Sequence, residues 1–308
     1  MRIATAIVNW NNPDIPDVLP WIPYGEAMDH FVEAGYDATE WGPSMPTDPD
    51  VLGSDLRSRG LDMVGAFVGL GFRDAGKRES EIERALGIAR FLVANGGTRL
   101  IAAEAGDDRR RGEAGHVDES RGLTDEQWRN LADGLDELGR RLEPFGMELA
   151  FHNHVGTYVE TPAETARLLD ETDPALVGWC LDIGHLAYGG GAAMDMLPRY
   201  ADRVKHVHIK DVDGVVLAKA KAEGWSFGRA LAAYIFPPLG EGIARIPEVV
   251  RALGDVGYDG WYVIEQDTSP DPTATARVNR EYLERLLGVE GPDGRAAARR
   301  ARSHGGDG

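Results

Sequence analysis

Histidines and carboxylates occur at the ends of short apolar segments along this chain, where they could perform acid–base or metal chemistry. His206, His208 and Lys210 alternate in one segment, so their side chains share one face of an extended strand. His152 and His154 alternate in the same way in another segment. Further segments end in other polar or aromatic residues: Trp10, Asn11, Glu40, Trp41, Glu104, Asp182, His185, Glu265 and Asp267. If the fold gathers these groups, a divalent cation would keep the carboxylates ionised and the imidazoles neutral.

One residue from each of four segments makes the expected metal site: His152, Asp182, His208 and Glu265. Oxygen and nitrogen donors without a thiolate suit Mn²⁺, with Co²⁺, Fe²⁺, Mg²⁺ or Zn²⁺ as alternatives. Each residue also has a structural explanation. Asp182 could cap a following helix, and Glu265 could pair with an arginine. His152 or His154 could be a buried core histidine, so the sequence leaves open which strand-end residue is the fourth ligand.

The elements that would position these residues alternate along the whole chain. Strands are expected at residues 3–8, 38–41, 62–68, 99–103, 148–153, 177–182, 204–210 and 261–266. Helices are expected at 26–34, 80–95, 247–256 and 273–287, and two more begin near Thr124 and Pro162. This alternation predicts a parallel sheet, and the length suits a single (β/α)8 TIM barrel, an α/β fold whose strand ends converge on one rim. No Gly-x-Gly-x-x-Gly follows the first strand, which argues against an open dinucleotide-binding sheet.

Two segments depart from this alternation. Residues 213–241, after the seventh strand, form a long connection with Trp225, Phe227, Tyr234 and Phe236, and we expect a lid or pocket wall there. Residues 290–308 contain four arginines among Ala and Gly without apolar periodicity, which predicts a disordered tail after a catalytic domain at 1–289.

Composition narrows the class of protein. The 308 residues include 33 Lys and Arg against 51 Asp and Glu, a net charge of −18, which disfavours nucleic-acid binding. No apolar run approaches the roughly 18 residues of a membrane span, and the N-terminus lacks a signal-peptide layout. The single cysteine, Cys180, fits a buried thiol in a reducing cytoplasm. A cytoplasmic enzyme is therefore expected.

Three segments resemble the xylose-isomerase-like barrel superfamily of sugar isomerases, epimerases and inosose dehydratases: 181–185 (LDIGH), 206–211 (HVHIKD) and 260–265 (GWYVIE). Within it, the chain is most similar to the inosose (2-keto-myo-inositol) dehydratases. The segments that carry this resemblance are 9–11 (NWN), 151–154 (FHNH), 159–161 (VET), 185–190 (HLAYGG), 222–227 (AEGWSF) and 238–242 (PLGEG). The resemblance covers residues 2–288.

The resemblance implies a divalent metal at Asp182, His208 and Glu265, with a fourth ligand from the fifth strand. Ketose 3-epimerases carry a glutamate at the position that aligns with His152, so their symmetric two-carboxylate proton exchange is in doubt here. The implied reaction is elimination of water next to a ketone through a metal-stabilised enediolate. Glu265 or His154 would be the base, and His185 or Lys210 the acid. The sequence does not choose between them.

Other residues are expected to contact the substrate. Glu104, Asn11 and Glu40 would bind ring hydroxyls, and three tryptophans would cover apolar sugar faces: Trp10, Trp41 and Trp225. The acidic net charge favours a neutral keto-polyol or keto-sugar over a sugar phosphate.

Alternatives remain open at this stage. The same site would suit a keto-sugar isomerase or epimerase, or an enzyme that cleaves 3-keto-glycosides. A non-catalytic sugar-binding barrel is a second class, and an apurinic endonuclease on the same fold is disfavoured by the charge. The sequence also leaves open a homo-oligomer or a small partner subunit.

Overall fold

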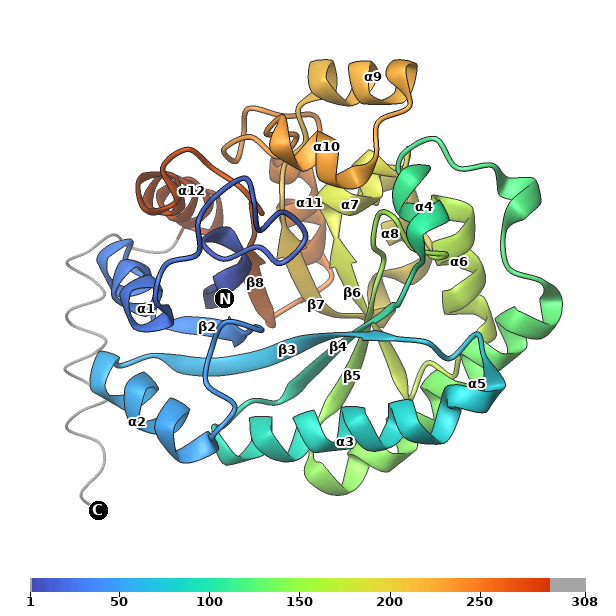
Figure 1. Ribbon diagram of the computed structural model, residues 1–308, viewed down its shortest axis with the longest axis horizontal. Coiled ribbons are helices and arrows are strands. Elements are labelled where there is room, and N and C mark those ends of the chain that lie inside the picture. The colour runs from blue at the N-terminus through green and yellow to red at the C-terminus, as the bar shows by residue number, and fades with distance from the viewer. Residues whose placement is uncertain (1, 289–308) are drawn as a thin grey trace.

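Eight parallel strands close into a barrel in the computed structural model, which describes residues 2–288 (Figure 1). Each strand pairs with the next along the chain, and β8 pairs back to β1. The strands are β1 Arg2–Ala6, β2 Ala38–Trp41, β3 Asp62–Leu70, β4 Arg99–Glu104, β5 Glu148–His152, β6 Val177–Asp182, β7 Val204–Ile209 and β8 Trp261–Ile264. This architecture confirms the predicted TIM barrel.

The helices follow the strands and surround the barrel (Figure 1). They are α1 Tyr24–Glu33, α2 Pro49–Arg59, α3 Arg78–Ala94, α4 Asp108–Gly112, α5 Asp125–Leu142, α6 Pro162–Glu171, α7 Ile183–Tyr188, α8 Ala193–Tyr200, α9 Gly214–Glu223, α10 Phe227–Ala232, α11 Ile246–Asp255 and α12 Pro272–Leu287. Short 3-10 turns occupy Ile7–Asn9, Ala75–Lys77, Glu119–Arg121, Glu143–Phe145 and Ala201–Arg203. No helix in residues 2–288 is both long enough and apolar enough to cross a membrane.

Local sequence explains where several helices begin. Thr124 and Thr161 cap α5 and α6, and in each case the residue three positions on, Gln127 or Glu164, returns a bond to the capping backbone. Along α5 the buried leucines recur at helical spacing and pack against the outside of the barrel: Leu131, Leu135, Leu138 and Leu142. Caps and apolar periodicity therefore fix the helices that hold the strands in register.

Residues 213–241 differ from the expected long loop, because the chain forms α9 and α10 there. Asp213 accepts hydrogen bonds from the N–H groups of Val215 and Val216, and Gly224 ends α9 with a φ of 62° that suits glycine. Phe227, the first residue of α10, and Phe236 belong to a separate apolar cluster with residues of both helices. Figure 1 shows α9 and α10 standing out from the rest of the barrel. The predicted tail, residues 290–308, lies outside the described residues.

The strands bring their carboxyl ends to one mouth of the barrel. His152 and Asp182 are the last residues of β5 and β6, and Asp182 lies in register with His208 on β7. Glu265 follows the last residue of β8 directly. Cys180 lies below this mouth as a buried free thiol, and burial raises its pKa to about 11, as expected for a core residue.

Candidate metal and active site at the barrel mouth

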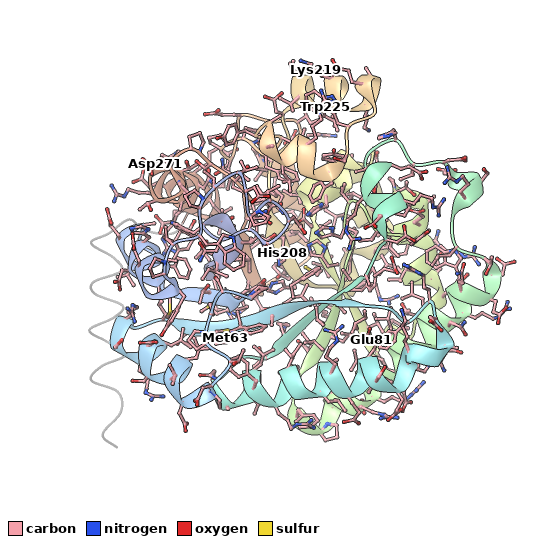
Figure 2. All side chains as sticks on the ribbon, viewed as in Figure 1. Met63, Glu81, His208, Lys219, Trp225 and Asp271 are labelled. Carbon is pink, nitrogen blue, oxygen red and sulfur yellow. The ribbon has the colours of Figure 1, made fainter. Side chains whose placement is uncertain are left out.

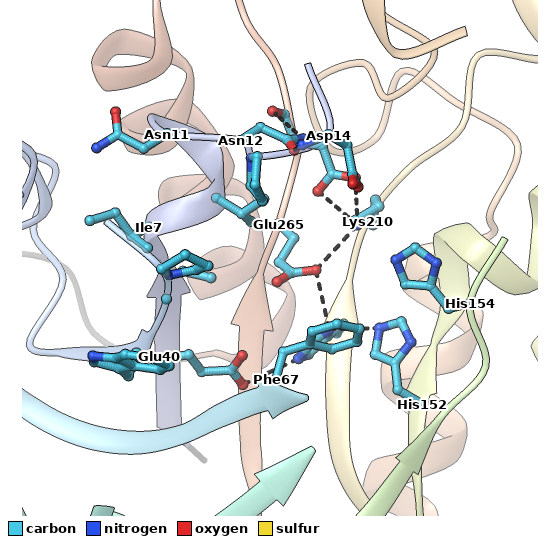
Figure 3. Close-up of a pocket in the computed structure, with 18 residues that line it drawn as sticks. Ile7, Asn11, Asn12, Asp14, Glu40, Phe67, His152, His154, Lys210 and Glu265 are labelled. Carbon is cyan, nitrogen blue, oxygen red and sulfur yellow. Dashed lines mark hydrogen bonds and ion pairs between the residues drawn. The ribbon is translucent and has the colours of Figure 1, made fainter. Parts of the chain in front are cut away.

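A cavity of about 240 Å³ opens at the mouth of the barrel (Figure 3). It is lined by Ala6, Ile7, Val8, Asn11, Asn12, Pro13, Asp14, Glu40, Trp41, Gly42, Pro43, Phe67, His152, His154, His208, Lys210, Glu265 and Asp267. A second cavity of about 520 Å³ shares Asp14, Phe67 and His154 with the first, so the two adjoin. The strand-end residues singled out from the sequence therefore surround a space open to a small molecule.

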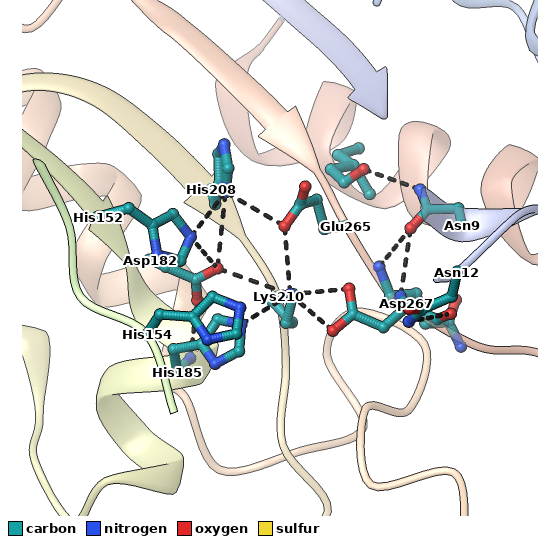
Figure 4. Close-up of polar contacts among 12 residues, drawn as sticks. Asn9, Asn12, His152, His154, Asp182, His185, His208, Lys210, Glu265 and Asp267 are labelled. Carbon is teal, nitrogen blue, oxygen red and sulfur yellow. Dashed lines mark hydrogen bonds and ion pairs between the residues drawn. The ribbon is translucent and has the colours of Figure 1, made fainter. Parts of the chain in front are cut away.

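Four side chains converge at the floor of the first cavity: His152, Asp182, His208 and Glu265. One donor atom from each lies within 4.8 Å of the donor atoms of all the others. His208 Nδ1 lies 3.1 Å from Glu265 Oε2 and 3.1 Å from His152 Nε2, and the latter lies 3.4 Å from Asp182 Oδ2 (Figure 4). The structure thus brings together the four residues expected as metal ligands.

The hydrogen bonding of this cluster fits a divalent cation. Oδ1 of Asp182 caps α7 by accepting a hydrogen bond from the N–H of His185 at 2.7 Å. Oδ2 of the same carboxylate is buried and accepts no hydrogen bond from any described residue. The two roles considered for Asp182, helix cap and metal ligand, are therefore compatible, with one oxygen available for each. A buried carboxylate oxygen beside two imidazole nitrogens is a donor set that divalent metals take.

The electrostatics of His208 also favour a positive charge in this cluster. Burial alone would lower the pKa of His208, but the surrounding groups Cys180, Glu265 and Glu40 outweigh this and raise the pKa well above its ordinary value. The carboxyl of Glu265 would likewise be harder to ionise on burial, yet His208 and Lys210 hold its pKa below its usual range. Positive charge is therefore favourable at the point where these groups meet.

Lys210 lies beside this cluster as a cation. Its Nζ donates to Oδ1 and Oδ2 of Asp267 at 2.8 and 3.0 Å, and lies 3.2 Å from both Glu265 Oε2 and His185 Nε2 (Figure 4). Burial alone would lower the pKa of Lys210, but the carboxylates of Asp267, Glu265 and Asp182 raise it above its ordinary value. Lys210 therefore presents an ammonium group to the cavity.

His154 lies on the same side of the cavity as His152 (Figure 3). Its Nδ1 lies 2.7 Å from the carbonyl oxygen of Val155, so this nitrogen carries the ring hydrogen as a donor. Nε2 then keeps its lone pair, and none of the hydrogen bonds among the described residues uses it. Removal from water lowers the pKa of His154 to about 3, with smaller contributions from His152 and Lys210. The ring is therefore neutral, with the lone pair of Nε2 left free of hydrogen bonds to the described residues.

Two tryptophans expected to cover a sugar do not line the cavity, and we correct these assignments. Trp10 donates its Nε1–H to Thr273 Oγ1 at 3.2 Å and packs on Phe31 in the core. Trp225 donates to Glu223 and packs beneath α9 and α10, on the outer side of the molecule (Figure 2). Both are packing residues because their aromatic surface is already covered by the protein. Trp41 does line the cavity, although its Nε1–H is bonded to the carbonyl of Pro46.

The polar residues expected to bind ring hydroxyls are engaged by the protein itself. Glu104 pairs with Arg73 and accepts bonds from the N–H groups of Gly106 and Tyr158, and it lines the second cavity rather than the first. Asn11 lines the first cavity but bonds the backbone of Ile22 with both its amide groups. A side chain with its groups already engaged is a poor hydroxyl ligand.

Glu40 also departs from its expected role as a hydroxyl ligand. Its Oε1 lies 2.6 Å from His206 Nε2 and 3.2 Å from His208 Nε2, which means that the carboxylate is held by two imidazoles. Glu40 lines the cavity, but its exposed fraction is only 2%. The carboxylate is thus held by His206 and His208, with little of its surface left for a substrate hydroxyl.

Among the polar and aromatic residues that line the cavity, sequence reasoning missed three: Asn12, Asp14 and Phe67. Phe67 is the most informative, since its ring is 42% exposed from the middle of β3 and lies edge-on, 5.7 Å between centroids, to His152. A large aromatic residue in the inward register of a barrel strand was the signal that could have found it. Asp267 was noted at a strand end but given no role, whereas the structure pairs it with Lys210.

Comparison with known proteins gives a consistent result. The family described as "Xylose isomerase-like TIM barrel" matches residues 28–286. A protein named inosose dehydratase from Geobacillus kaustophilus is 34% identical over 294 residues, which cover 93% of this chain and 94% of that protein. A protein of the same name from Lacticaseibacillus casei is 31% identical and covers 94% and 98%.

Solved structures share the fold at lower identity. The IolI protein with a bound zinc atom superposes with a TM-score of 0.69 at 14% identity, and covers 95% of this chain and all of that one. A probable 3-DHS dehydratase, AsbF of Bacillus anthracis, gives a TM-score of 0.68 at 15% identity, with 92% and 98% covered.

Proposed function

This chain belongs to the xylose isomerase-like TIM barrel family, and we propose that it is a metal-dependent dehydratase acting on a keto-polyol such as 2-keto-myo-inositol. The observation that carries the proposal is the convergence of two imidazoles and two carboxylates beside a charged lysine, at the floor of an open cavity. The relatives named inosose dehydratase, which match nearly the whole chain, support the choice of reaction.

His152, Asp182, His208 and Glu265 would hold the metal. Their mixed nitrogen and oxygen donors suit Mn²⁺, with Co²⁺, Fe²⁺, Mg²⁺ or Zn²⁺ as alternatives. When bound, such a cation supplies Lewis-acid polarisation of a ketone, which makes the neighbouring C–H more acidic. All remaining steps fall to side chains of this chain.

We assign His154 as the base that removes the proton next to the ketone. Its Nε2 lone pair faces the cavity because Val155 holds the ring hydrogen on Nδ1. Glu265, the alternative, has its Oε2 engaged by His208 and Lys210. A base needs an accessible lone pair within reach of the substrate, and the geometry of His154 meets this condition better.

We assign Lys210 as the group that assists departure of the hydroxyl. The C–H electron pair forms the new carbon–carbon double bond, the adjacent C–O bond breaks, and the hydroxyl leaves as water with a proton from the ammonium. His185 Nε2, 3.2 Å from Lys210 Nζ, is the alternative donor. Asp267 fixes Lys210 in place through both of its oxygens.

The charge of the cavity favours a neutral substrate. Among its lining residues, Lys210 is the one lysine or arginine and His208 has a raised pKa, against the four carboxyl groups of Asp14, Glu40, Glu265 and Asp267. A phosphate would meet this excess of negative charge, whereas the hydroxyls of a polyol bond to carboxylates without that cost.

The test is to incubate the metal-free protein with 2-keto-myo-inositol, with and without added Mn²⁺, and to follow the ultraviolet absorbance of the enone product. We expect absorbance to rise only in the presence of metal. A new ketose detected by NMR without enone would show an isomerase or epimerase instead. No conversion and no bound metal would leave only a sugar-binding barrel and would refute the proposal.

A further inference from the structure

We propose that Glu40 is a positioning residue of the metal centre, which holds the ring of His208 with Nδ1 directed at the cation. The inference rests on the metal site of the proposed function and deepens it. Glu40 comes from β2 and His208 from β7, with β1 and β8 between them in the barrel. The contact therefore spans the barrel interior, and it carries no role in the reaction as assigned above.

The first argument is the number of ring hydrogens. A carboxylate only accepts hydrogen bonds, so the contacts of Glu40 Oε1 with His206 Nε2 at 2.6 Å and His208 Nε2 at 3.2 Å require a hydrogen on each of these nitrogens. A histidine that binds a metal is a neutral imidazole, which has one N–H. Nδ1 of His208 must then carry a lone pair, which is the form that binds a metal.

The second argument is where that lone pair is directed. His208 Nδ1 lies 3.1 Å from Glu265 Oε2 and 3.7 Å from Asp182 Oδ2, both of which are acceptors. A lone pair directed at two carboxylate oxygens is repulsive unless a cation lies between them. The bond from Glu40 thus holds the ring with Nδ1 toward the two carboxylates, where either a proton on Nδ1 or a metal in its place makes the contact favourable.

The third argument is the contrast with the other histidine of the cluster. Nδ1 of His152 is buried and has no hydrogen-bond partner among the described residues. No hydrogen bond at Nδ1 therefore fixes the ring of His152, whereas Glu40 fixes the ring of His208 through Nε2. Metal-binding histidines held by an outer carboxylate bind more strongly, and loss of that carboxylate typically weakens metal binding about 10–100-fold.

His206 serves as the second anchor of Glu40. Its Nε2 faces Glu40, its ring is fully buried, and its Nδ1 makes no hydrogen bond with the described residues. Donor atoms of Glu40, His206 and His208 also lie within 4.8 Å of one another, as in a metal site. We favour hydrogen bonds over a second metal because the 2.6 Å contact is an ordinary hydrogen-bond length. The number of metal ions bound decides between them.

The experiment measures metal binding without substrate. Zn²⁺ and Mn²⁺ are titrated into the metal-free wild type and into Glu40→Leu and Glu40→Gln, in competition with a fluorescent chelator. We expect one metal per chain, about 10–100-fold weaker binding by Glu40→Leu, and a smaller loss by Glu40→Gln, whose amide oxygen still accepts. Glu104→Gln is the matched control, since Glu104 is another buried strand-end carboxylate that bonds an arginine and backbone instead of a histidine. It should bind metal as the wild type does.

Two further measurements separate positioning from folding. Thermal unfolding of the metal-free proteins reports the cost to the fold, and Glu40→Gln keeps the volume if Glu40→Leu does not fold. In the Zn²⁺-loaded wild type, nitrogen NMR of the histidine rings should show His208 with metal on Nδ1 and hydrogen on Nε2.

The outcomes are distinguishable. Unchanged metal affinity in both Glu40 variants, metal on Nε2 of His208, or two metals per chain would each overturn the role of Glu40 while leaving the dehydratase proposal intact. A wild type that binds no metal would instead refute the metal centre itself.

Discussion

The imidazole rings of His154 and His185 lie nearly stacked, with centroids 4.0 Å apart and planes inclined by 31°. His185 is fixed in turn, because its Nδ1 accepts a hydrogen bond from the N–H of Val155 at 3.2 Å. Val155 therefore orients His154 through its carbonyl oxygen and His185 through its N–H. The proposed base and its neighbour are thus both held by the backbone of Val155, in the connection that follows β5.

Replacement of His154 by Gln should reduce kcat by about 10²–10⁴, the usual contribution of a positioned base. Metal content should stay at the wild-type level, because His154 is not among the four converging ligands. Steady-state kinetics and metal analysis check both expectations. His116→Gln is a matched control, since His116 also bonds a backbone carbonyl but lies outside both cavities. A fully active His154→Gln would remove His154 as the base.

Replacement of His208 or Glu265 by Ala should abolish turnover and lower the bound metal. His152→Ala should lose less metal than His208→Ala, because no carboxylate holds the ring of His152 from behind. Metal analysis after dialysis against a limiting metal concentration gives the order. Equal metal content in wild type and all three variants would contradict the ligand assignment.

Phe67→Ala should raise KM for the keto-polyol by about tenfold with a smaller change in kcat. The exposed ring offers an apolar face to the C–H groups of a sugar, and aromatic contacts of this kind contribute on the order of 1 kcal/mol. Val215→Ala removes another exposed apolar side chain, outside both cavities, and should change neither constant. An unaltered KM in Phe67→Ala would show that the substrate does not reach β3.

Asp211→Ala should lower the free energy of unfolding by about 3 kcal/mol, because several buried N–H groups lose their acceptor at once. The carboxylate of Asp211 accepts bonds from the backbone of Val212, Gly240, Gly242 and Ala244. Asp213→Ala, which removes only the cap of α9, should cost about 1 kcal/mol. Chemical denaturation compares the two variants, and equal losses would argue against this role of Asp211.

Glu160 should make stability depend on pH. Burial raises the pKa of its carboxyl from 4.5 to about 7, although the N–H groups of Gly156 and Gly115 act in the opposite direction. The folded state therefore holds a proton that the unfolded state has lost, and stability falls as pH rises from about 4.5 to 7, by about 3 kcal/mol in all. Glu160→Gln should flatten this part of the curve of unfolding free energy against pH. A curve identical to that of the wild type would contradict the shift.

The barrel and the convergence of four candidate metal-binding side chains were accessible from the sequence for one physical reason. In a parallel barrel every strand delivers its carboxyl end to the same mouth, so residues far apart in the chain, such as Asp182 and Glu265, meet once the strands are placed. Period-two alternation placed His208 on one face of its strand with His206 and Lys210, but it did not by itself choose among the three.

The roles of individual polar side chains were less accessible, because a hydrogen-bond partner can come from any strand. Glu40 is satisfied from the far side of the barrel, and Glu104 by Arg73, and neither pairing leaves a local pattern in the sequence. By residue type, Trp10 and Trp225 could each stack on a sugar ring. Only the structure shows that Trp10 packs on Phe31 and that Trp225 packs in the apolar cluster of α9 and α10.

The converging donors all come from β5 to β8, whereas Trp41 and Phe67, which form the opposite wall, come from β2 and β3. In the proposed reaction the second half of the barrel would thus carry the reactive groups, and the first half would shape the space for the substrate. Substitutions at Trp41 on β2 or Phe67 on β3 would therefore alter substrate preference without changing the donor residues of β5 to β8. Glu40 is the exception, since it lies on β2 but contacts His208 on β7, so a substitution there would reach the donor cluster as well.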